Sequence, residues 1–447
     1  MAIKKLKTWK EAFMEPVDFG DFPYEATEAQ HAARQFYPPV IDSVPVEERQ
    51  KEGYFFSDEV TSANAENVRF LRCRDVRLDY DVHAEEDVAS DVHWTHPGVP
   101  LPNLEVIVGN VDLGVDSATD GLDRLERIVG SLDIRNAEVT LPALSRVGDR
   151  VYVGRQSSLN CPNLIEVECG GISAHGSVSC ERLRSVGHLE LYHGRFSFPR
   201  LEKCEMLDLS DVRSADLSLL RRAGTMRVYG GGDYSFSSLE KVDSYLVARG
   251  VHSVDAQRLS TVGGLTVESS SDGVFNFPSL FEVGGAYRNR ADELVYHGDC
   301  EVISGHLETP KLQAVYGSLE YCHDGSAVFS SLNKVKGDLF VNCGHWISTG
   351  PGSKEEDGLH FERRKIDDPS GFQRRFSLPS LASVGGRMEV HDNTFLSCPV
   401  LERVGKTLDL GRVVNLDVKG KIEARRFSSR TPGQKRHVNI PDKGLSV

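Results

Sequence analysis

The sequence has no uninterrupted apolar run near the roughly 18 residues that a membrane-spanning helix needs. Its opening residues, MAIKKLKTWKEAF, contain early lysines but not the apolar stretch of a secretory signal. Apolar residues make up 39% of the 447 residues and charged residues 26%, a balance typical of a protein folded in water. We therefore expect no membrane association and a cytoplasmic location, or export by a route without a cleavable signal.

Disulfide and catalytic signatures are also missing. The nine cysteines are odd in number and follow no disulfide-framework spacing, which favours a reducing compartment. The chain contains no P-loop, no GxSxG, no HExxH and no GxGxxG after a strand. These absences remove the commonest motifs of nucleotide-binding proteins, serine hydrolases and zinc peptidases. They predict a protein that is not an enzyme and that has no cofactor.

Negative charge outnumbers positive charge outside the last thirty residues. From 418 to 447 there are eight Lys or Arg residues against two Asp or Glu residues, a charge of +6. Because the whole chain carries −14, the rest carries −20. Such an acidic body repels phosphate backbones and anionic lipids, so we expect no direct nucleic-acid partner.

An internal repeat is what the sequence does have. The stretch LPALSRVGDRVYV at 141–153 returns as LPSLASVGGRMEV at 378–390. The second leucine of each stretch serves as an anchor, and equivalent anchors follow one another at steps near twenty, except for steps of 32 after Leu280 and 49 after Leu332. The fourteen anchors are Leu104, Leu125, Leu144, Leu164, Leu183, Leu201, Leu220, Leu239, Leu259, Leu280, Leu312, Leu332, Leu381 and Leu401.

The columns around the anchor are apolar as well. The third residue before it is mostly Leu, Phe or Cys, and the third after it is mostly Val or Ile. A glycine and an apolar-x-apolar triplet such as 151–153 or 408–410 commonly follow. This alternation predicts a short strand with one buried face. One such unit cannot bury that face alone, so we expect a repeat solenoid of about fourteen stacked turns with parallel strands, mostly β in content.

The repeat L-P-x-L-x-x-V-x-G-x-L-x-V, between about 100 and 417, resembles a leucine-rich repeat and is near the short bacterial class in length. It is similar also to the repeats of receptor L-domains, which share the V-G-G-x-L-x-V run. The resemblance implies a solenoid and does not specify a function. The asparagine that follows the strand in standard leucine-rich repeats is mostly missing here, with Asn393 the clearest candidate. A straighter or twisted solenoid is therefore an alternative to a smoothly curved horseshoe.

The ends of the array need caps, because terminal turns expose core and strand edges. We expect an α-containing N-terminal cap over 1–100, with a short helix at 27–37 and an irregular first turn at 68–82. The solenoid is predicted over 101–417, and a basic, flexible tail over 418–447.

The two long steps predict insertions near 288–305 and 343–376. Insertions of this kind form loops on one face of a solenoid and often carry its binding residues. The larger one contains Trp346 together with an acidic run and a basic run. It fits a loop that becomes ordered on a partner, and equally a mobile, solvated excursion.

Outward residues of the triplets are the candidate binding surface. Tyrosine, arginine and carboxylates without a catalytic arrangement are typical of protein recognition, whereas a merely solvated sheet face is the alternative. The predicted partner-binding residues are Tyr152, Glu190, Tyr192, Arg227, Tyr229, Tyr287, Phe340 and, in the larger insertion, Trp346.

Cysteine and histidine clusters offer little chemistry. His323 and Cys343 each follow their anchor by eleven residues and should lie side by side, but zinc needs four ligands and none closes the set, so we expect no metal. Tyr192-His193-Gly194 recurs as Tyr296-His297-Gly298, which we interpret as turn histidines. Four cysteines occupy core columns and should be inert, buried residues: Cys161, Cys180, Cys204 and Cys398.

The sequence thus predicts a non-enzymatic scaffold that captures a protein partner, such as a bacterial or mobile-element effector or inhibitor. An alternative is a β-solenoid enzyme acting on a polysaccharide, although the expected outward column has no tight carboxylate pair of the kind that glycoside hydrolysis uses. A weaker alternative is an acidic mimic of nucleic acid, whose acidic column would be interrupted at positions 152, 227, 246, 287 and 340.

Overall fold

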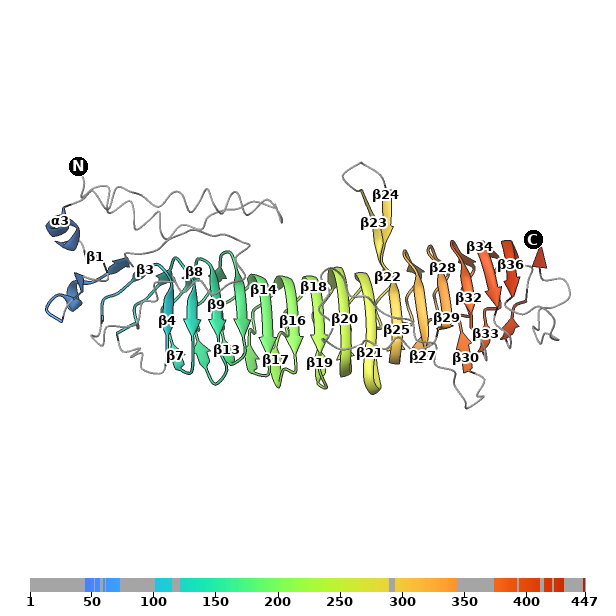
Figure 1. The fold of residues 1–447 in the computed structure, drawn as a ribbon, viewed down its shortest axis with the longest axis horizontal. Helices are drawn as coiled ribbons and strands as arrows, with labels where there is room; N and C mark the ends of the chain where they lie inside the picture. Colours follow the sequence, from blue (N-terminus) through green and yellow to red (C-terminus); the bar gives the residue numbers. More distant parts are fainter. Residues whose placement is uncertain are drawn as a thin grey trace, which may run out of the picture. The chain divides into compact units, whose positions relative to one another are not determined.

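The computed structural model shows a parallel β-solenoid of about 14 turns of about 20 residues, nearly all of it strand (Figure 1). This confirms the predicted fold class. The structure describes residues 45–51, 53–56, 59–60, 62–72, 101–114, 121–288, 294–343, 374–391, 394–410, 414–419, 422–429 and 445–446. The chain divides into two compact units. Unit 1 comprises Met1–Leu201 and Val212–Leu217, and unit 2 comprises Glu202–Asp211 and Ser218–Val447.

Three rows of parallel strands build unit 1, because each turn supplies one strand to each row. Row A contains β1 (Tyr54–Phe56), β2 (Phe70–Arg72), β3 (Val106–Val108), β5 (Arg127–Ile128), β8 (Arg146–Val147) and β11 (Glu166–Val167). Row B contains the predicted triplets in β4 (Val111–Leu113), β6 (Leu132–Ile134), β9 (Arg150–Val153), β12 (Gly171–Ala174) and β14 (Ser185–Tyr192). Row C contains β7 (Glu138–Thr140), β10 (Ser158–Asn160), β13 (Ser177–Ser179), β15 (Arg195–Ser197) and β17 (Ser214–Asp216).

Unit 2 repeats this plan with longer strands that run through the corners. Row B continues the triplet pattern in β16 (Lys203–Ser210), β18 (Arg222–Tyr229), β20 (Lys241–Asp255), β21 (Thr261–Asn276), β25 (Cys300–Glu308), β27 (Leu319–Val328), β29 (Leu339–Cys343), β32 (Met388–Val390), β34 (Arg403–Leu410) and β36 (Ile422–Ser429). Shorter strands at the other sides are β19 (Asp233–Ser235), β22 (Glu282–Val283), β26 (Ala314–Val315), β28 (Lys334–Val335), β31 (Ser383–Val384), β30 (Arg374–Ser377), β33 (Thr394–Ser397) and β35 (Val414–Asp417).

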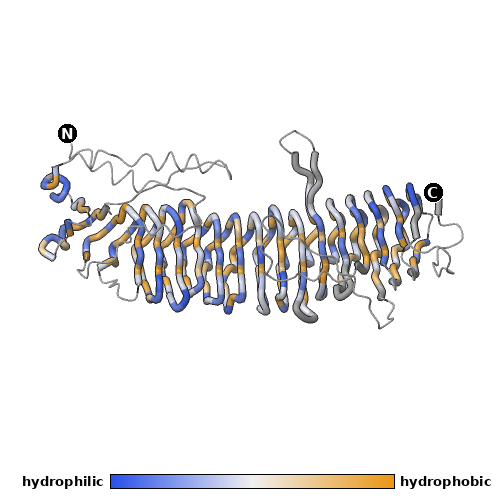
Figure 2. The backbone as a smooth tube through the Cα atoms, viewed as in Figure 1, coloured by the Kyte–Doolittle hydropathy of each residue, from blue (hydrophilic) through white to orange (hydrophobic). Residues whose placement is uncertain are grey.

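The predicted apolar columns form the core of both units. All fourteen anchor leucines are fully buried. The strand register stacks like on like, for example Val151 between Leu132 and Ile172 in row B. Figure 2 shows the same result as apolar stretches that return from turn to turn along the chain. Each apolar side chain therefore packs on the equivalent side chain one turn away, about 4.8 Å along the stack.

Tight corners require glycine at selected positions. A Cβ atom added to Gly148 would lie 2.1 Å from the carbonyl oxygen of Val129, on the preceding turn. The corner after row B uses the left-handed backbone region, which Asn136, Gln156, His193 and Asp211 adopt with φ between 50° and 59°. His193 is thus a turn residue, as predicted. His297 instead ends a hairpin strand, so the two Tyr-His-Gly motifs are not equivalent.

The four core-column cysteines are buried and unpaired, as predicted. Burial raises the pKa of the Cys180, Cys204 and Cys398 thiols to about 12, so these groups are protonated and unreactive near neutrality. Cys300 is buried in the same way, because it begins β25 in the core. The sequence pattern had placed Cys300 in an insertion.

The described part of the N-terminal cap extends row A. β1 pairs in parallel with β2, and β2 pairs with β3 of the first regular turn. Residues 70–72 thus lie in the ladder within the irregular first turn predicted over 68–82, and residues 73–82 lie outside the described residues. The described helices are α3 (Val46–Lys51) and the 3-10 helix η2 (Ala65–Asn67), and neither is long and apolar enough to cross a membrane. The helix predicted at 27–37 lies outside the described residues.

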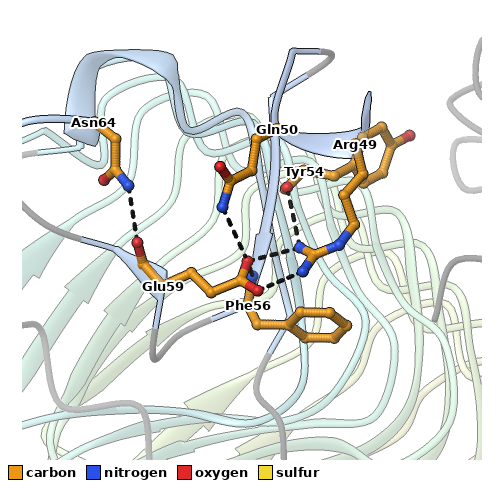
Figure 3. A network of polar contacts seen from close by, with 6 residues as sticks. All are labelled: Arg49, Gln50, Tyr54, Phe56, Glu59 and Asn64. Atoms are coloured by element: carbon orange, nitrogen blue, oxygen red, sulfur yellow. Dashed lines mark hydrogen bonds and ion pairs between the residues drawn. The ribbon is translucent and has the colours of Figure 1, made fainter. Parts of the chain in front are cut away.

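A buried ion pair ties α3 to β1 (Figure 3). Arg49 donates two hydrogen bonds to the carboxylate of Glu59, one of them at 2.7 Å, and its guanidinium lies over the ring of Phe56 at 4.3 Å. The backbone N–H of Phe56 donates to the same carboxylate at 3.1 Å, and Gln50 donates at 3.4 Å. The hydrogen bond from Arg49 holds the pKa of Glu59 below its usual value. The network fixes the cap against the first strands.

The parallel ladder extends beyond the C-terminal boundary at 417 that the repeat predicts. β36 pairs with β34 from Glu423 to Ser429, so the ladder continues beyond 417, and β37 (Leu445–Ser446) pairs with β36. The sequence pattern missed this turn because it lacks an anchor leucine, while Ile422 and Ala424 supply the buried side chains. The larger insertion lies mostly at 344–373, outside the described residues.

Candidate functional site

The outward residues of row B form a column whose members are neighbours on successive turns. In unit 1 the register places Asp112, Asp133, Tyr152, Ser173 and Glu190 side by side. In unit 2 the column contains Asp208, Arg227, Val247, Thr266, Glu301, Glu320, Phe340, Glu389 and Asp409. Counting along the repeat predicts most of these outward residues correctly, but it predicts the wrong residue at two positions.

Position 246 is the first difference. The register between β18 and β20 shifts between Ala223 and Met226, so Arg227 pairs with Val247. Leu246 is fully buried in the core. An extra residue in β20 causes the shift, and a count from the anchor leucine does not detect a bulge of this kind.

Tyr287 is the second difference, because the repeat pattern had placed this predicted partner-binding residue in the outward column. It lies in β23 (Gly285–Arg288), which pairs in antiparallel fashion with β24 (Leu294–His297), so Tyr287 is not in row B. Figure 1 shows this hairpin projecting from the stack of unit 2. Gly284 and Gly298 flank it with positive φ values, which let the chain leave and rejoin the turn. The insertion therefore precedes the strand, whereas the repeat pattern alone suggested that it followed.

Two carboxylates are neighbours in the outward column because Glu301, and not Tyr287, occupies the position next to Glu320. With the hairpin removed from the ladder, Thr266 pairs with Glu301, and Glu301 pairs with Glu320 on the next turn. The hydroxyl of Thr266 donates a hydrogen bond of 3.1 Å to Glu301. Burial, and then the charge of Glu320, raises the pKa of Glu301. The column thus contains an adjacent acidic pair that the sequence pattern concealed.

Farther along unit 2, Phe340 lies between Glu320 and Glu389 in the column. Arg387 bridges Glu389 and Asp409, with contacts of 2.9 Å and 2.8 Å. These carboxylates are nearly buried and ion-paired. Their arrangement stabilises this part of row B.

An aromatic and arginine-rich face occupies row B of unit 2 before the hairpin. Arg227 donates to Asp208 at 3.3 Å, and 44% of its side chain is exposed. Tyr229 follows two residues later on the same face and is half-buried. Tyr245 precedes Val247 by two residues and is 45% exposed. Tyr245 was not among the predicted residues, because the bulge in β20 moves it to the outward side.

A hollow opens on row B of unit 1. It has a volume of about 680 Å³ and is lined by Asp133, Arg135, Asn136, Arg150, Tyr152, Gly154, Arg155 and His175. The rings of His175 and Tyr192 are stacked at 4.5 Å with an interplanar angle of 12°. Tyr152 presents its ring to His175 at 6.1 Å in an edge arrangement. The structure therefore brings together the predicted residues Tyr152 and Tyr192 through a histidine that the sequence did not single out.

The hollow contains more positive than negative charge. Asp133 accepts a hydrogen bond of 3.1 Å from Arg135. Arg150 and Arg155 are exposed, and neither pairs with a carboxylate in the described part of the chain. Burial, followed by the nearby charge of Arg155, lowers the pKa of His175, so its imidazole is neutral at pH 7. Glu190, also predicted for partner binding, lies close enough to oppose this effect.

The remaining candidates do not join these faces. Trp346 lies outside the described residues. The backbone register pairs Cys343 with Cys322 rather than with His323, because it shifts between Tyr321 and Cys322. Within the described ranges, no three Cys, His, Asp or Glu side chains gather in a way that could hold a metal ion.

Comparison with known proteins gives no match to a family model, to a curated protein or to a solved structure. The fold and the faces of row B therefore have to be interpreted from the residues of this chain.

Proposed function

We propose that this protein is a non-enzymatic scaffold, a solenoid of the leucine-rich-repeat kind that holds a protein partner against row B. The kinship rests on the repeat L-P-x-L-x-x-V-x-G-x-L-x-V, together with the parallel turns that it encodes. Solenoids of this kind use their extended surface for binding, and fold alone does not define their partner.

The face formed by Arg227, Tyr229, Tyr245 and Val247 carries the proposal. It combines an arginine and two tyrosines with an aliphatic side chain on rigid neighbouring strands. Arginine and tyrosine are enriched among residues that dominate protein interfaces, because each buries a large area while retaining polar groups for pairing. Strands rather than loops position these side chains, so little conformational entropy is lost on binding.

The test is capture of a partner identified by affinity purification from the native source, followed by binding measurements with purified components. The double variant Arg227→Glu with Tyr245→Ala should weaken binding by at least thirtyfold, since interface residues of this kind each contribute about 2 kcal/mol or more. The matched control is Arg258→Glu with Leu219→Ala, which changes an exposed arginine and an exposed apolar residue of unit 2 away from row B.

Equal affinity of both double variants and the wild type, with unchanged melting temperatures, would remove row B of unit 2 as the binding face. Loss of binding in both double variants would indicate a general surface effect and would also contradict the assignment.

A second function, action on a polysaccharide, is favoured by the pair Glu301 and Glu320. Retaining glycoside hydrolases hold two carboxyl groups about 5 to 5.5 Å apart, close to the spacing of about 4.8 Å between adjacent strands. The raised pKa of Glu301 suits a general acid. Release of reducing ends from a glycan by the wild type, and its loss in Glu301→Gln and Glu320→Gln, would support this function over the scaffold.

A further inference from the structure

We propose that the hollow of unit 1 is a binding site for a small ligand in which a flat ring carries an anionic group, and that the ring inserts beside Gly154. This site is separate from the protein-binding face of unit 2 and does not depend on it.

Gly154 leaves one position vacant in a series of side chains on successive turns. It follows Val153, which pairs with Ile134 on one side and Ala174 on the other, so its neighbours are Arg135 and His175. These two residues lie two turns apart, at about 9.6 Å between their backbones. Tyr192 continues the series on the turn after His175. The order along the stack is therefore guanidinium, vacancy, imidazole and phenol.

The backbone at Gly154 is not in the left-handed region, and a side chain there needs only a small shift of its neighbours. A Cβ atom added to Gly154 would meet the carbonyl oxygen of Ile134 at 3.2 Å, the Cα of Arg135 at 3.7 Å and Cε1 of Tyr152 at 3.7 Å. Gly148 and Gly194 differ, because a Cβ atom there would lie 2.1 Å and 2.0 Å from a carbonyl oxygen. The missing side chain at Gly154 thus leaves room that the Ile134 carbonyl and the Tyr152 ring border, and a Cβ atom there would meet a smaller clash than at Gly148 or Gly194.

An aromatic surface borders that space. Tyr192 covers one face of the His175 ring, and the other face is directed toward the turn of Gly154. Tyr152 supplies a ring edge beside it. A neutral imidazole with one free face and a guanidinium on the opposite side can enclose a planar ring, since both groups stack on π systems.

The positive side chains that line the hollow favour an anionic ligand. Arg135, Arg150 and Arg155 line the hollow, and Asp133 is the carboxylate there. Arg150 and Arg155 have no carboxylate partner among the described residues, so their planar forks can bind a carboxylate or a phosphate. This local excess of positive charge occurs in a chain with a net charge of −14. The volume of about 680 Å³ is within the range of small-molecule sites.

Two polar atoms of the lining support a polar ligand. Nδ1 of His175 and Oδ1 of Asp133 are buried and accept or donate no hydrogen bond within the described structure. Buried polar atoms are nearly always satisfied in folded proteins. A hydroxyl or amino group on the ligand ring is able to donate to Asp133, whose side chain is 11% exposed.

The experiment is isothermal titration calorimetry of the full chain with two probes that share this chemistry. Adenosine monophosphate carries a base and a phosphate, and 4-hydroxybenzoate carries a ring and a carboxylate. Adenosine lacks the anion, while inorganic phosphate and acetate lack the ring. We expect at least one ring-anion probe to bind tenfold or more tightly than each fragment that lacks one of the two parts. Binding of adenosine monophosphate alone assigns the site to nucleotides, and binding of 4-hydroxybenzoate alone assigns it to aromatic acids.

Two variants locate the site. Gly154→Leu fills the vacancy without a left-handed backbone and should abolish binding, and Arg150→Gln with Arg155→Gln should weaken it at least tenfold. The matched control, Arg195→Gln with Arg213→Gln, removes two exposed arginines of unit 1 outside the hollow and should bind as the wild type does. Binding no tighter than that of phosphate, acetate or adenosine would overturn the proposal. Unchanged binding by Gly154→Leu, with wild-type melting, would overturn it as well.

Discussion

Row B carries the same kind of inward residues in unit 1 and in unit 2 but different outward ones. In unit 1 the outward side has a vacancy at Gly154 between Arg135 and His175. In unit 2 it has the exposed ring of Tyr245 and the adjacent acidic pair Glu301 and Glu320. The inward columns must match from turn to turn, because each side chain packs on its equivalent one turn away. Outward residues have no such constraint, so function can vary there while the fold does not.

The largest expected effects concern the buried anchor leucines, and they test whether the two units depend equally on these side chains for stability. Leu144→Ala in unit 1 and Leu381→Ala in unit 2 each remove a fully buried anchor side chain. We expect each to lower the free energy of unfolding by about 2 to 5 kcal/mol, because the lost transfer energy adds to the cost of a cavity. Urea unfolding followed by circular dichroism measures both losses.

Tyr152→Ala is the control for the anchors, because it shortens an outward residue and should cost much less than either core change. A loss below 1 kcal/mol for one anchor alone would show that the two units are not equally dependent on their repeat. Comparable losses of unfolding free energy in both anchor variants would show that the same buried columns stabilise unit 1 and unit 2.

The inward columns were predictable from the sequence because packing repeats them. The buried anchors, the buried cysteines and the row B triplets all follow from a period near twenty. Outward positions were predictable only where the ladder has no irregularity, as at Tyr152 and Arg227. A bulge displaced position 246 by one residue, and the hairpin at 285–297 replaced Tyr287 with Glu301 in the column.

The hollow of unit 1 could not be predicted in the same way. A glycine in a strand has no side chain, so its meaning depends on what lies one turn before and one turn after. Register alone reveals that Arg135 and His175 flank Gly154, and side-chain geometry alone reveals the stacked ring of Tyr192. The final turn at 422–429 escaped prediction for another reason, since its strand pairs with β34 but its anchor leucine is absent.

A smaller expected effect separates glycines that the fold requires from the one that leaves a space. Gly148→Ala places a Cβ atom 2.1 Å from the carbonyl oxygen of Val129, so backbone atoms must move. Overpacking of this kind costs about 1 to 3 kcal/mol. Gly154→Ala, with its nearest contact at 3.2 Å, should change the free energy of unfolding by no more than about 0.5 kcal/mol.

Thermal unfolding of the two alanine variants side by side measures the difference. Equal destabilisation would mean that Gly154 is a corner glycine like the others, and the proposed vacancy between Arg135 and His175 in unit 1 would lose its significance. A Gly154→Ala variant as stable as the wild type would show that this glycine is not required by the fold. The space on the outward side of row B would then be a feature that distinguishes unit 1 from unit 2.

The smallest expected effect concerns the pH dependence of unit 1. Burial and Arg155 lower the pKa of His175 below its usual value, so the folded state binds the proton less readily than the unfolded chain. His175 therefore contributes stability that is present above the unfolded pKa of about 6.5 and is lost as the pH falls through the lower folded pKa. The wild type should lose stability between pH 7.5 and pH 5.5, and His175→Gln should lose less.

His188→Gln changes an exposed histidine on the next turn of row B and should behave as the wild type does. Melting temperatures at both pH values check this, and equal pH dependence of His175→Gln and the wild type would contradict a partly buried, neutral imidazole at the edge of the hollow.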